Sequence, residues 1–284
     1  MAFEKLKHKR ELIISCALLI VLCCLFVYAV LIEPAMLVVQ KQTIKVPHWS
    51  SGLNHLKVAV LSDLHVGALH ITVEKLHTIV QEVNQQQPDI VFLLGDYVTG
   101  HGGHTSLRPE AFVHELSGLT AKYGVYSVLG NHDWWYNGED VREHLEKAGI
   151  IVLENNAVEV EIKGESLWVS GLADLWTRRP DIKMAMLNVP STASCVMLMH
   201  NPDMFPEVPN SVSLSLAGHT HGGQVAVPFF GPIIVPSQLG SHFARGLVVQ
   251  ENKHYFVTSG IGTSILPVRF GVPPEICILD LCSN

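Results

Sequence analysis

Hydrophobic and polar positions divide the chain into one long apolar run and a series of short apolar segments that end in polar clusters. The long run, Leu12 to Ile32, contains no charged residue, and as a helix it would span about 30 Å, enough to cross a bilayer. We therefore expect a transmembrane helix at residues 12–32, after a short N-terminal segment at residues 1–11. A cleaved signal peptide is the alternative, but its apolar region is normally shorter, and no small-residue cleavage site precedes Glu33-Pro34.

The segment after the apolar run is polar and contains turn-forming residues. Gln40–Asn54 includes Pro47 and a Ser-Ser-Gly sequence, so we interpret residues 33–55 as a linker between the membrane and a folded domain at residues 56–284.

The basic residues on the two sides of the apolar run predict its orientation. Lys5, Lys7, Lys9 and Arg10 precede the run, whereas only Lys41 and Lys45 follow it closely. Because cytoplasmic flanks carry the excess of basic residues, we expect the N-terminus in the cytoplasm. The chain would then be a single-pass protein of the cell or inner membrane, with its folded domain outside the cytoplasm.

The periodicity after residue 56 predicts an α/β fold. Strands are expected at Lys57–Leu61, Asp89–Leu94 and Tyr123–Leu129, and helices at Thr72–Gln87, Pro109–Ala121 and Gly138–Ala148. This alternation is typical of parallel strands joined by right-handed crossovers. From Ile151 to Leu281 the pattern shows only short strand candidates separated by turns, which indicates a second sheet with few helices, packed on the first.

Composition restricts the class of partner. A hydrophobic fraction of 48% supports a large core, and a formal net charge of −7 argues against a nucleic-acid backbone as the main partner. The negative charge is compatible with phosphate chemistry, since bound cations reverse the local sign.

Five predicted strands are followed directly by residues that can hold metal ions. The clusters are Asp63-Leu64-His65, Gly95-Asp96, Gly130-Asn131-His132-Asp133, His200, and Gly218-His219-Thr220-His221. Any one of them could be an ordinary helix cap or turn, but five strand ends built from Asp, His and Asn are hard to explain in that way. Because side chains alternate along an extended segment, we expect Asp63 and His65 to point to one side, and likewise His219 and His221.

The types of ligand predict the class of metal. Carboxylate, imidazole and amide groups without a thiolate suit Mn²⁺, Fe²⁺, Zn²⁺ or Co²⁺ rather than Ca²⁺. Seven such groups exceed the needs of one closed zinc site and suit two divalent ions that share a ligand, and a carboxylate can bridge two ions with both of its oxygens. Gly95 and Gly130 are expected to form close backbone turns at this site.

In this order, the five clusters resemble the signature of the calcineurin-like metallophosphoesterases, over about Lys57 to Leu281. Gly222-Gly223-Gln224 and the run Gly260–Ser264 resemble a bacterial, membrane-tethered, phosphodiesterase-like subgroup. The resemblance implies a four-layer α/β/β/α sandwich in which two packed mixed sheets are flanked by helices. It also implies hydrolysis of a phosphate ester, through attack at phosphorus by a hydroxide held between two divalent ions.

The resemblance further implies a role for each residue of the clusters. Asp63, His65 and His221 would hold one ion, Asn131, His200 and His219 would hold the other, and Asp96 would bridge them. His132 would be a catalytic residue that stabilises the transition state or protonates the leaving oxygen, and Asp133 would orient its imidazole.

The sequence leaves the substrate open. One alternative is a pyrophosphohydrolase of the kind that cleaves UDP-2,3-diacylglucosamine in lipid A synthesis, although that chemistry belongs on the cytoplasmic side. Another is a non-catalytic scaffold that binds metal structurally, for which loss of ligands would be expected. The partner in the leading interpretation is a phosphoester, with a lipid-linked or nucleotide-linked ester as candidates.

Several aromatic and basic residues are candidates for contact with that substrate, although packing, an exposed loop or a salt bridge would explain each of them as well. They are Trp134, Trp135, Tyr136, Trp176, Arg178, Arg179, Phe229, Phe230, His101, His104 and Arg269.

Overall fold

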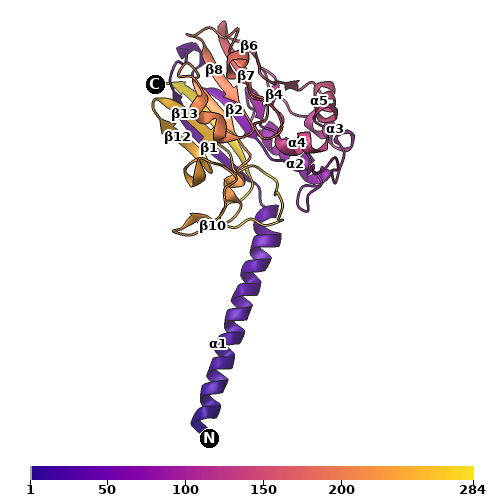
Figure 1. Ribbon diagram of the computed structural model, residues 1–284, viewed down its shortest axis with the longest axis vertical. Helices are drawn as coiled ribbons and strands as arrows, with labels where there is room; N and C mark the ends of the chain where they lie inside the picture. The colour runs from indigo at the N-terminus through magenta and orange to yellow at the C-terminus, as the bar shows by residue number, and fades with distance from the viewer. Residues whose placement is uncertain (1) are drawn as a thin grey trace.

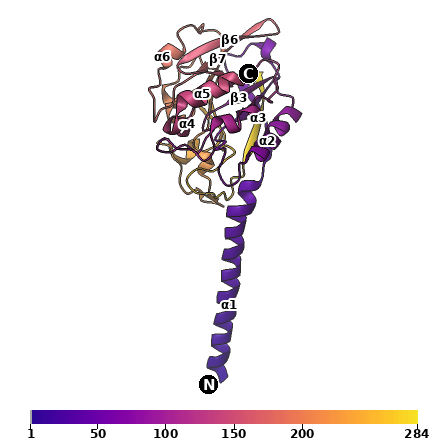
Figure 2. The ribbon, with the colours of Figure 1, turned by 90° about the vertical axis from the view of Figure 1, so that its right-hand side faces the viewer.

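The computed structural model describes residues 2–284 and shows a long helix that projects from a folded domain (Figure 1). Helix α1 (Ala2–Val27) continues through a π-helical turn at Tyr28–Ile32 and a 3₁₀ turn at Glu33–Ala35. Among the described residues, this is the one helix that is long and apolar enough to cross a membrane, and none of its apolar stretch is buried by the domain. Figure 2 shows the same separation from a second direction.

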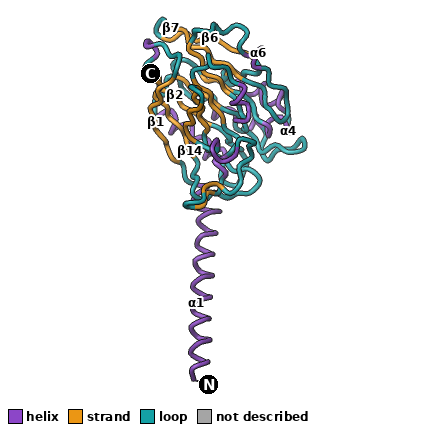
Figure 3. The backbone as a smooth tube through the Cα atoms, turned by 60° about the vertical axis from the view of Figure 1, so that its left-hand side comes forward, coloured by secondary structure: helices purple, strands orange, loops and turns teal. Residues whose placement is uncertain are grey.

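The domain contains two six-stranded sheets and a two-stranded hairpin (Figure 3). The first sheet has the order β1-β14-β2-β3-β4-β5, formed by Val38–Val46, Glu275–Ser283, Leu56–Leu61, Ile90–Leu93, Val125–Ser127 and Ile151–Val152. The second has the order β12-β13-β9-β8-β7-β6, formed by Gly246–Gln250, Lys253–Val257, Leu214–Ala217, Ser194–Leu198, Glu165–Gly171 and Asn156–Ile162. The hairpin pairs β10 (Ala226–Val227) with β11 (Gly231–Pro232).

Both large sheets are mixed. In the first sheet, four strands run parallel to one another: β2, β3, β4 and β5; β14 is antiparallel to β2. In the second sheet, the four parallel strands are β7, β8, β9 and β13, and the edge strands β6 and β12 are antiparallel to their neighbours. The parallel core of each sheet therefore presents the carboxyl ends of several strands at one edge, and the parallel strands of the first sheet are those that the sequence predicts.

The two sheets pack against each other through alternate residues of their strands. In β2, Val58 and Val60 lie in the core between the sheets, together with Val169 of β7 and Val196 of β8. The intervening residue Ala59 faces the helices on the other side. Two-residue periodicity thus divides each central strand between two cores, which confirms the four-layer sandwich.

Helices cover the first sheet more fully than the second. The helices are α2 (Val73–Gln85), α3 (Val113–Leu116), α4 (Asn131–Tyr136), α5 (Gly138–Lys147) and α6 (Ile182–Ala185). In α2, the Thr72 side chain accepts a hydrogen bond from the Lys75 N–H, so Thr72 is the N-cap of this helix. The outer face of the second sheet is covered by α6 and by 3₁₀ turns at Pro202–Glu207 and Gly240–Phe243.

Two local predictions are wrong. The helix expected at Pro109–Ala121 is a 3₁₀ turn at Pro109–Ala111 followed by the four-residue α3, because Phe112 has a non-helical φ of −132°. The residues of the expected linker also include an ordered strand, since β1 pairs with β14 along its whole length, from Val38 opposite Glu275 to Val46 opposite Ser283. Ile44 and Val46 are fully buried in the core. At the end of β1 these buried apolar residues alternate with exposed polar ones, which is typical of a strand with one exposed face.

Candidate metal centre

The polar clusters after five strands meet where the two sheets adjoin. Loops after β2, β3 and β4 bring residues from the first sheet, and loops after β8 and β9 bring residues from the second. The seven candidate ligands are at most 5% exposed: Asp63, His65, Asp96, Asn131, His200, His219 and His221. Such dense burial of ionisable groups is costly unless they bind one another or a metal.

The first group of candidate ligands contains Asp63, His65 and His221. His65 Nδ1 donates to the Val98 carbonyl (3.1 Å), which leaves His65 Nε2 facing His221 Nε2 at 3.3 Å. Burial lowers the pKa of His65 to about 4, and that of His221 well below its usual value, so at neutral pH both rings are neutral. Asp63 Oδ1 lies 3.4 Å from His221 Nε2. Unshared electron pairs that converge at these distances fit a cation.

The second group contains Asp96, His200 and His219, with Asn131 beside them. His200 Nδ1 donates to a backbone carbonyl, and His200 Nε2 lies 3.2 Å from both Asn131 Oδ1 and His219 Nδ1. Burial lowers the pKa of His200, but the carboxylates of Asp96, Asp63 and Asp174 together outweigh burial and raise it to about 10. A divalent ion bound where these atoms converge would compete with a proton on His200.

Asp96 belongs to both groups through a single oxygen. Asp96 Oδ2 lies 3.6 Å from His65 Nε2 and 3.2 Å from His200 Nε2. The other oxygen, Oδ1, accepts a hydrogen bond from the His132 backbone N–H at 2.8 Å. In this geometry the backbone of the next loop donates to Oδ1, and Oδ2 is the oxygen that faces the nitrogen atoms of both groups.

Five of the seven candidate ligands have left-handed backbone conformations: Asp63 (φ 54°), His65 (45°), Asp96 (56°), His219 (67°) and His221 (51°). Non-glycine residues rarely adopt this conformation, and it concentrates at functional sites. His219 and His221 line the same cavity, but they join different groups of candidate ligands. His219 lies in the second group and His221 in the first, as the family resemblance implies.

Glycines allow the loops to pass close together, as predicted for Gly95 and Gly130. A Cβ at Gly95 (φ 91°) would lie 2.5 Å from the Gly130 nitrogen. A Cβ at Gly130 would meet the Asp96 carboxylate and approach the His200 ring to 2.8 Å. A side chain at Gly130 would thus displace candidate ligands of the second group.

Asp133 has a different position from the one expected. Asp133 Oδ1 accepts from the Tyr97 N–H (2.8 Å) and the Val98 N–H (3.3 Å), and Oδ2 accepts from the Asp96 and Gly130 N–H groups (2.9 Å each). Burial raises the pKa of Asp133 to about 7, and donors at both oxygens oppose that rise. Asp133 is therefore a positioning residue that joins the loops after β3 and β4, and the expectation that it orients His132 is wrong.

His132 is oriented by a backbone carbonyl instead. His132 Nδ1 donates to the Gly100 oxygen (2.8 Å), and Nε2 faces the Ser264 hydroxyl (3.2 Å). The ring stacks edge-on against Trp135 at a centroid distance of 4.8 Å. Sequence reasoning missed Gly100 and Ser264 as partners of His132, and only the unusual Gly260–Ser264 run pointed to that part of the chain.

The comparisons with known proteins agree with this geometry. The family model described as calcineurin-like phosphoesterase matches residues 56–223. This chain belongs to the calcineurin-like phosphoesterase family. An uncharacterized metallophosphoesterase of Bacillus subtilis, YkuE, is 31% identical, and the match covers 90% of each chain. The phosphodiesterase YaeI of Escherichia coli is also 31% identical, over 79% of this chain and 82% of that protein.

Among solved structures, the NAD nucleotidase of Haemophilus influenzae is similar with 14% identity and a TM-score of 0.48. That match covers 72% of this chain and 45% of the nucleotidase, so the chain spans less than half of that structure. Family membership makes the chain a hydrolase that acts on ester bonds, and members of the family normally bind divalent metal ions.

The phosphoesterase has a cavity of about 540 Å³ above the candidate ligands. Asp96, Asn131, His132, His219 and His221 form its floor. Its walls are mainly apolar or aromatic: Trp135, Trp176, Val225, Ile233, Ile234, Ile265, Leu266 and Val268. A larger cavity of about 880 Å³ at the far ends of β1 and β14 has none of the candidate ligands in its lining.

Only some of the candidate substrate contacts reach this cavity. Trp135, Trp176 and His101 line it, and Trp176 packs edge-on against His219 at 4.3 Å. Phe229 and Phe230 lie outside it on the hairpin, fully exposed.

The remaining candidates have structural partners elsewhere. Arg178 lies over the Trp134 ring at 4.2 Å and donates to Glu154. Tyr136 donates to Asp140, and the backbone carbonyl of Arg179 accepts from Asn155. His104 is exposed and pairs with His101 through the backbone.

Arg269 is fully buried, so it is neither a phosphate contact nor part of a salt bridge. Its guanidinium donates to the carbonyls of Ser259, Gly260, Gly262 and Val272. Arg269 thereby holds the Gly260–Ser264 loop against the centre.

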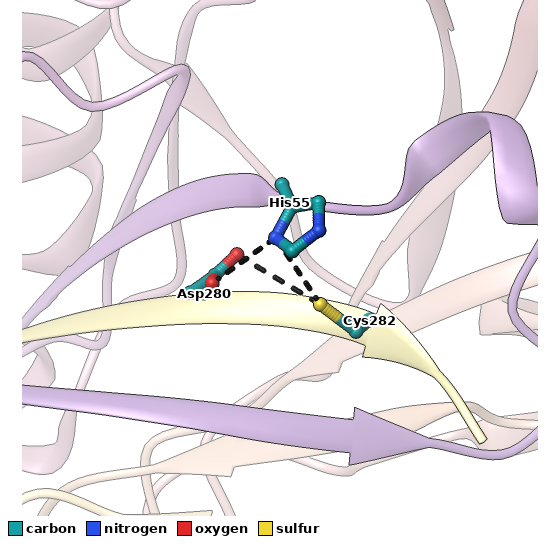
Figure 4. A group of neighbouring side chains, drawn as sticks. All are labelled: His55, Asp280 and Cys282. Carbon is teal, nitrogen blue, oxygen red and sulfur yellow. Dashed lines mark hydrogen bonds and ion pairs between the residues drawn. The ribbon is translucent and has the colours of Figure 1, made fainter.

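A third group of similar residue types lies on the surface, away from the cavity (Figure 4). His55 precedes β2, and Asp280 and Cys282 project from β14. His55 Nδ1 lies 3.3 Å from Asp280 Oδ2 and 3.6 Å from Cys282 Sγ. The His55 side chain is 79% exposed, so water can satisfy these groups and nothing requires a metal ion there.

Proposed function

We propose that this hydrolase is a phosphodiesterase that uses two divalent ions and is anchored in a membrane by α1. The observation that carries the proposal is the position of Asp96 Oδ2, which faces the nitrogen ligands of both groups at 3.2–3.6 Å. A shared oxygen between two cation-binding groups is the arrangement expected of a two-metal centre. The sequence similarity to a protein named as a phosphodiesterase supports the same conclusion.

The residues present fit two divalent ions. Asp63, His65 and His221 would hold one, Asn131, His200 and His219 would hold the other, and Asp96 would contact both. The imidazole, carboxylate and amide donors suit Mn²⁺, Fe²⁺, Zn²⁺ or Co²⁺. When bound, such ions make a water molecule more acidic and offset negative charge on the phosphate oxygens.

His132 is suited to act on the leaving group. Its Nδ1–H is held by the Gly100 carbonyl, so Nε2 is the atom that can exchange a proton with substrate. A protonated Nε2 donates to the departing ester oxygen, and the Ser264 hydroxyl at 3.2 Å keeps the ring aimed at the cavity. Asp133 contributes indirectly, because it fixes the loops that carry Asp96 and Asn131.

The shape of the site favours a diester over a monoester. A second cavity of about 520 Å³ adjoins the first, and the two share five lining residues: His101, His132, Ser264, Ile265 and Leu266. A phosphodiester carries an organic group on each side of phosphorus, and the two cavities provide space on each side of His132. A monoester would leave one of them filled only with water.

The membrane anchor completes the proposal. Helix α1 is long and apolar enough to span a bilayer. The basic residues before it predict that the phosphodiesterase domain lies on the extracytoplasmic side.

The direct test is hydrolysis by the full chain in detergent with added Mn²⁺. We expect bis-p-nitrophenyl phosphate to be cleaved with a higher kcat/KM than p-nitrophenyl phosphate, and EDTA to abolish turnover. A nucleotide-sugar pyrophosphate in the same panel tests the pyrophosphohydrolase alternative. Preferred cleavage of the monoester, or turnover that survives exhaustive chelation, would contradict the proposal.

A further inference from the structure

Two of the three most exposed large apolar residues of the domain lie at the tip of the β10–β11 hairpin. Phe229 is 105% exposed and Phe230 89%, and Ile234 just beyond the hairpin is 74% exposed. Ile265, in the loop on the other side of the cavity, is 98% exposed. A soluble surface rarely presents so many large apolar side chains together, and a rim of this kind marks an interaction site.

The position of the hairpin relative to α1 indicates what covers this surface. Figure 1 shows β10 at the end of the domain from which α1 leaves, and Figure 3 shows the same hairpin beside the end of the helix. The hairpin is bonded to the segment that docks on α1, because the Ala226 N–H donates to the Phe270 carbonyl and the Phe270 N–H donates to the Gln224 carbonyl.

The same segment is fixed to the end of α1. The Arg269 N–H donates to the Ala29 carbonyl at 2.9 Å, and Phe270 packs edge-on against Tyr28. The buried Glu33 carboxylate accepts from the N–H groups of Gly271 and Val272. These contacts replace the flexible linker that the sequence suggested, so the domain has a defined orientation relative to α1.

This geometry fixes the height of the hairpin above the bilayer. The apolar run ends at Ile32, so Glu33 and the segment bonded to it lie at the membrane surface. The hairpin tip is three residues from Ala226, or about 10 Å along an extended chain, which is within reach of the interface. Basic side chains lie at the same end, since Lys75 donates to the Ala35 carbonyl and Arg245 to the Gly271 carbonyl.

We propose that Phe229 and Phe230 insert into the surface of the bilayer that α1 spans, and that the cavity takes phosphodiesters bearing an apolar chain from that surface. The walls of the cavity connect the two regions, because Ile234 and Ile265 are both exposed at the rim and part of the cavity lining. An acyl or alkyl chain can thus remain in apolar contact while its phosphate reaches His132. The substrate part of this inference rests on the proposed phosphodiesterase function.

Tryptophan fluorescence tests the membrane contact independently of catalysis. The full chain is placed in phosphatidylcholine vesicles with brominated acyl chains, and the emission added by Phe230→Trp is measured against wild type. Leu187→Trp is the matched control, because Leu187 is 77% exposed just after α6, which lies far from α1 in Figure 2. We expect quenching of the Phe230→Trp emission alone. Emission from Phe230→Trp that is no more quenched than that of Leu187→Trp would overturn the inference.

A pair of diesters with the same leaving group tests the substrate class. Hexadecyl p-nitrophenyl phosphate in vesicles should be cleaved with a higher kcat/KM than ethyl p-nitrophenyl phosphate. The double variant F229S/F230S should lose about tenfold on the hexadecyl diester and nothing on the ethyl diester. The matched control Leu187→Ser should change neither rate.

The outcomes separate the two proposals. An equal loss on both diesters would show a structural role for the hairpin and overturn the inference. Failure of wild type to cleave either diester would refute the phosphodiesterase function and with it the substrate part, whereas the fluorescence result would still decide the membrane contact.

Discussion

The floor and the rim of the cavity are built from opposite kinds of residue. The floor consists of Asp, His and Asn side chains, most of them buried, and a hydrogen bond to the Gly100 carbonyl fixes the His132 ring. The rim consists of exposed aliphatic and aromatic side chains on two loops, such as Ile234 and Ile265. From this difference we expect the floor to determine the reaction and the rim to determine which substrate reaches it.

The largest effect is expected from Asp96→Asn in the floor. The substitution removes the negative charge that both groups share, so kcat on bis-p-nitrophenyl phosphate should fall by about 10³-fold. Asp280→Asn is the matched control, because Asp280 belongs to the exposed group with His55 and lies outside the cavity. A comparable loss in both variants would show that the floor has no special role.

His132→Asn tests the proposed role in protonating the leaving group. We expect kcat to fall by about 10²-fold for an alkyl leaving group and much less for p-nitrophenolate, which departs without a proton. The measurement is kcat for both leaving groups in wild type and variant. An equal loss for both would assign His132 to charge stabilisation instead.

Asp133→Asn should affect the stability of the floor. The amide offers one acceptor oxygen where the carboxylate offers two, so buried N–H groups lose their partners, at a cost of about 2 kcal/mol. Thermal unfolding followed by circular dichroism should show a Tm lower by about 4–8 °C. Asp140→Asn, in a partly exposed carboxylate that accepts from Tyr136, should change the Tm far less. Equal shifts would contradict the positioning role of Asp133.

The smallest effect is expected at the rim. Ile234→Ser should raise KM for bis-p-nitrophenyl phosphate about fivefold through lost apolar contact and leave kcat unchanged. Val249→Ser, at an exposed position of β12 outside the cavity, should leave both parameters unchanged. A fall in kcat for Ile234→Ser would contradict the assignment of substrate binding to the rim and of the reaction to the floor.

The sequence predicts the residues of the floor better than the residues that hydrogen-bond to them. Strand ends followed by Asp, His and Asn are visible as local patterns, because apolar runs and polar clusters are adjacent in the chain. The partners of those side chains come from distant segments. Asp133 contacts the loop after β3. Ser264 contacts His132 although the two residues are 132 positions apart in the sequence. Only the folded chain brings such pairs together.

The prediction of a linker at residues 33–55 was wrong for a related reason. The polar residues Gln40 and Lys41 indicated a linker, but the edge strand β1 has one exposed face on which polar residues are expected. Pairing with β14, from the other end of the chain, determines the structure of that segment. Phe229 and Phe230 could be identified as unusual from the sequence, but their position beside α1 depends on hydrogen bonds to Phe270.

The central claim is that two divalent ions share Asp96, and the most direct test is the number of metal ions bound per chain. Full-length protein loaded with Mn²⁺ and passed through gel filtration should retain about two ions per chain by mass spectrometry of the metal, and Asp96→Asn about one or none. Wild-type protein that is active on the diester with no more than a single ion per chain would contradict the account.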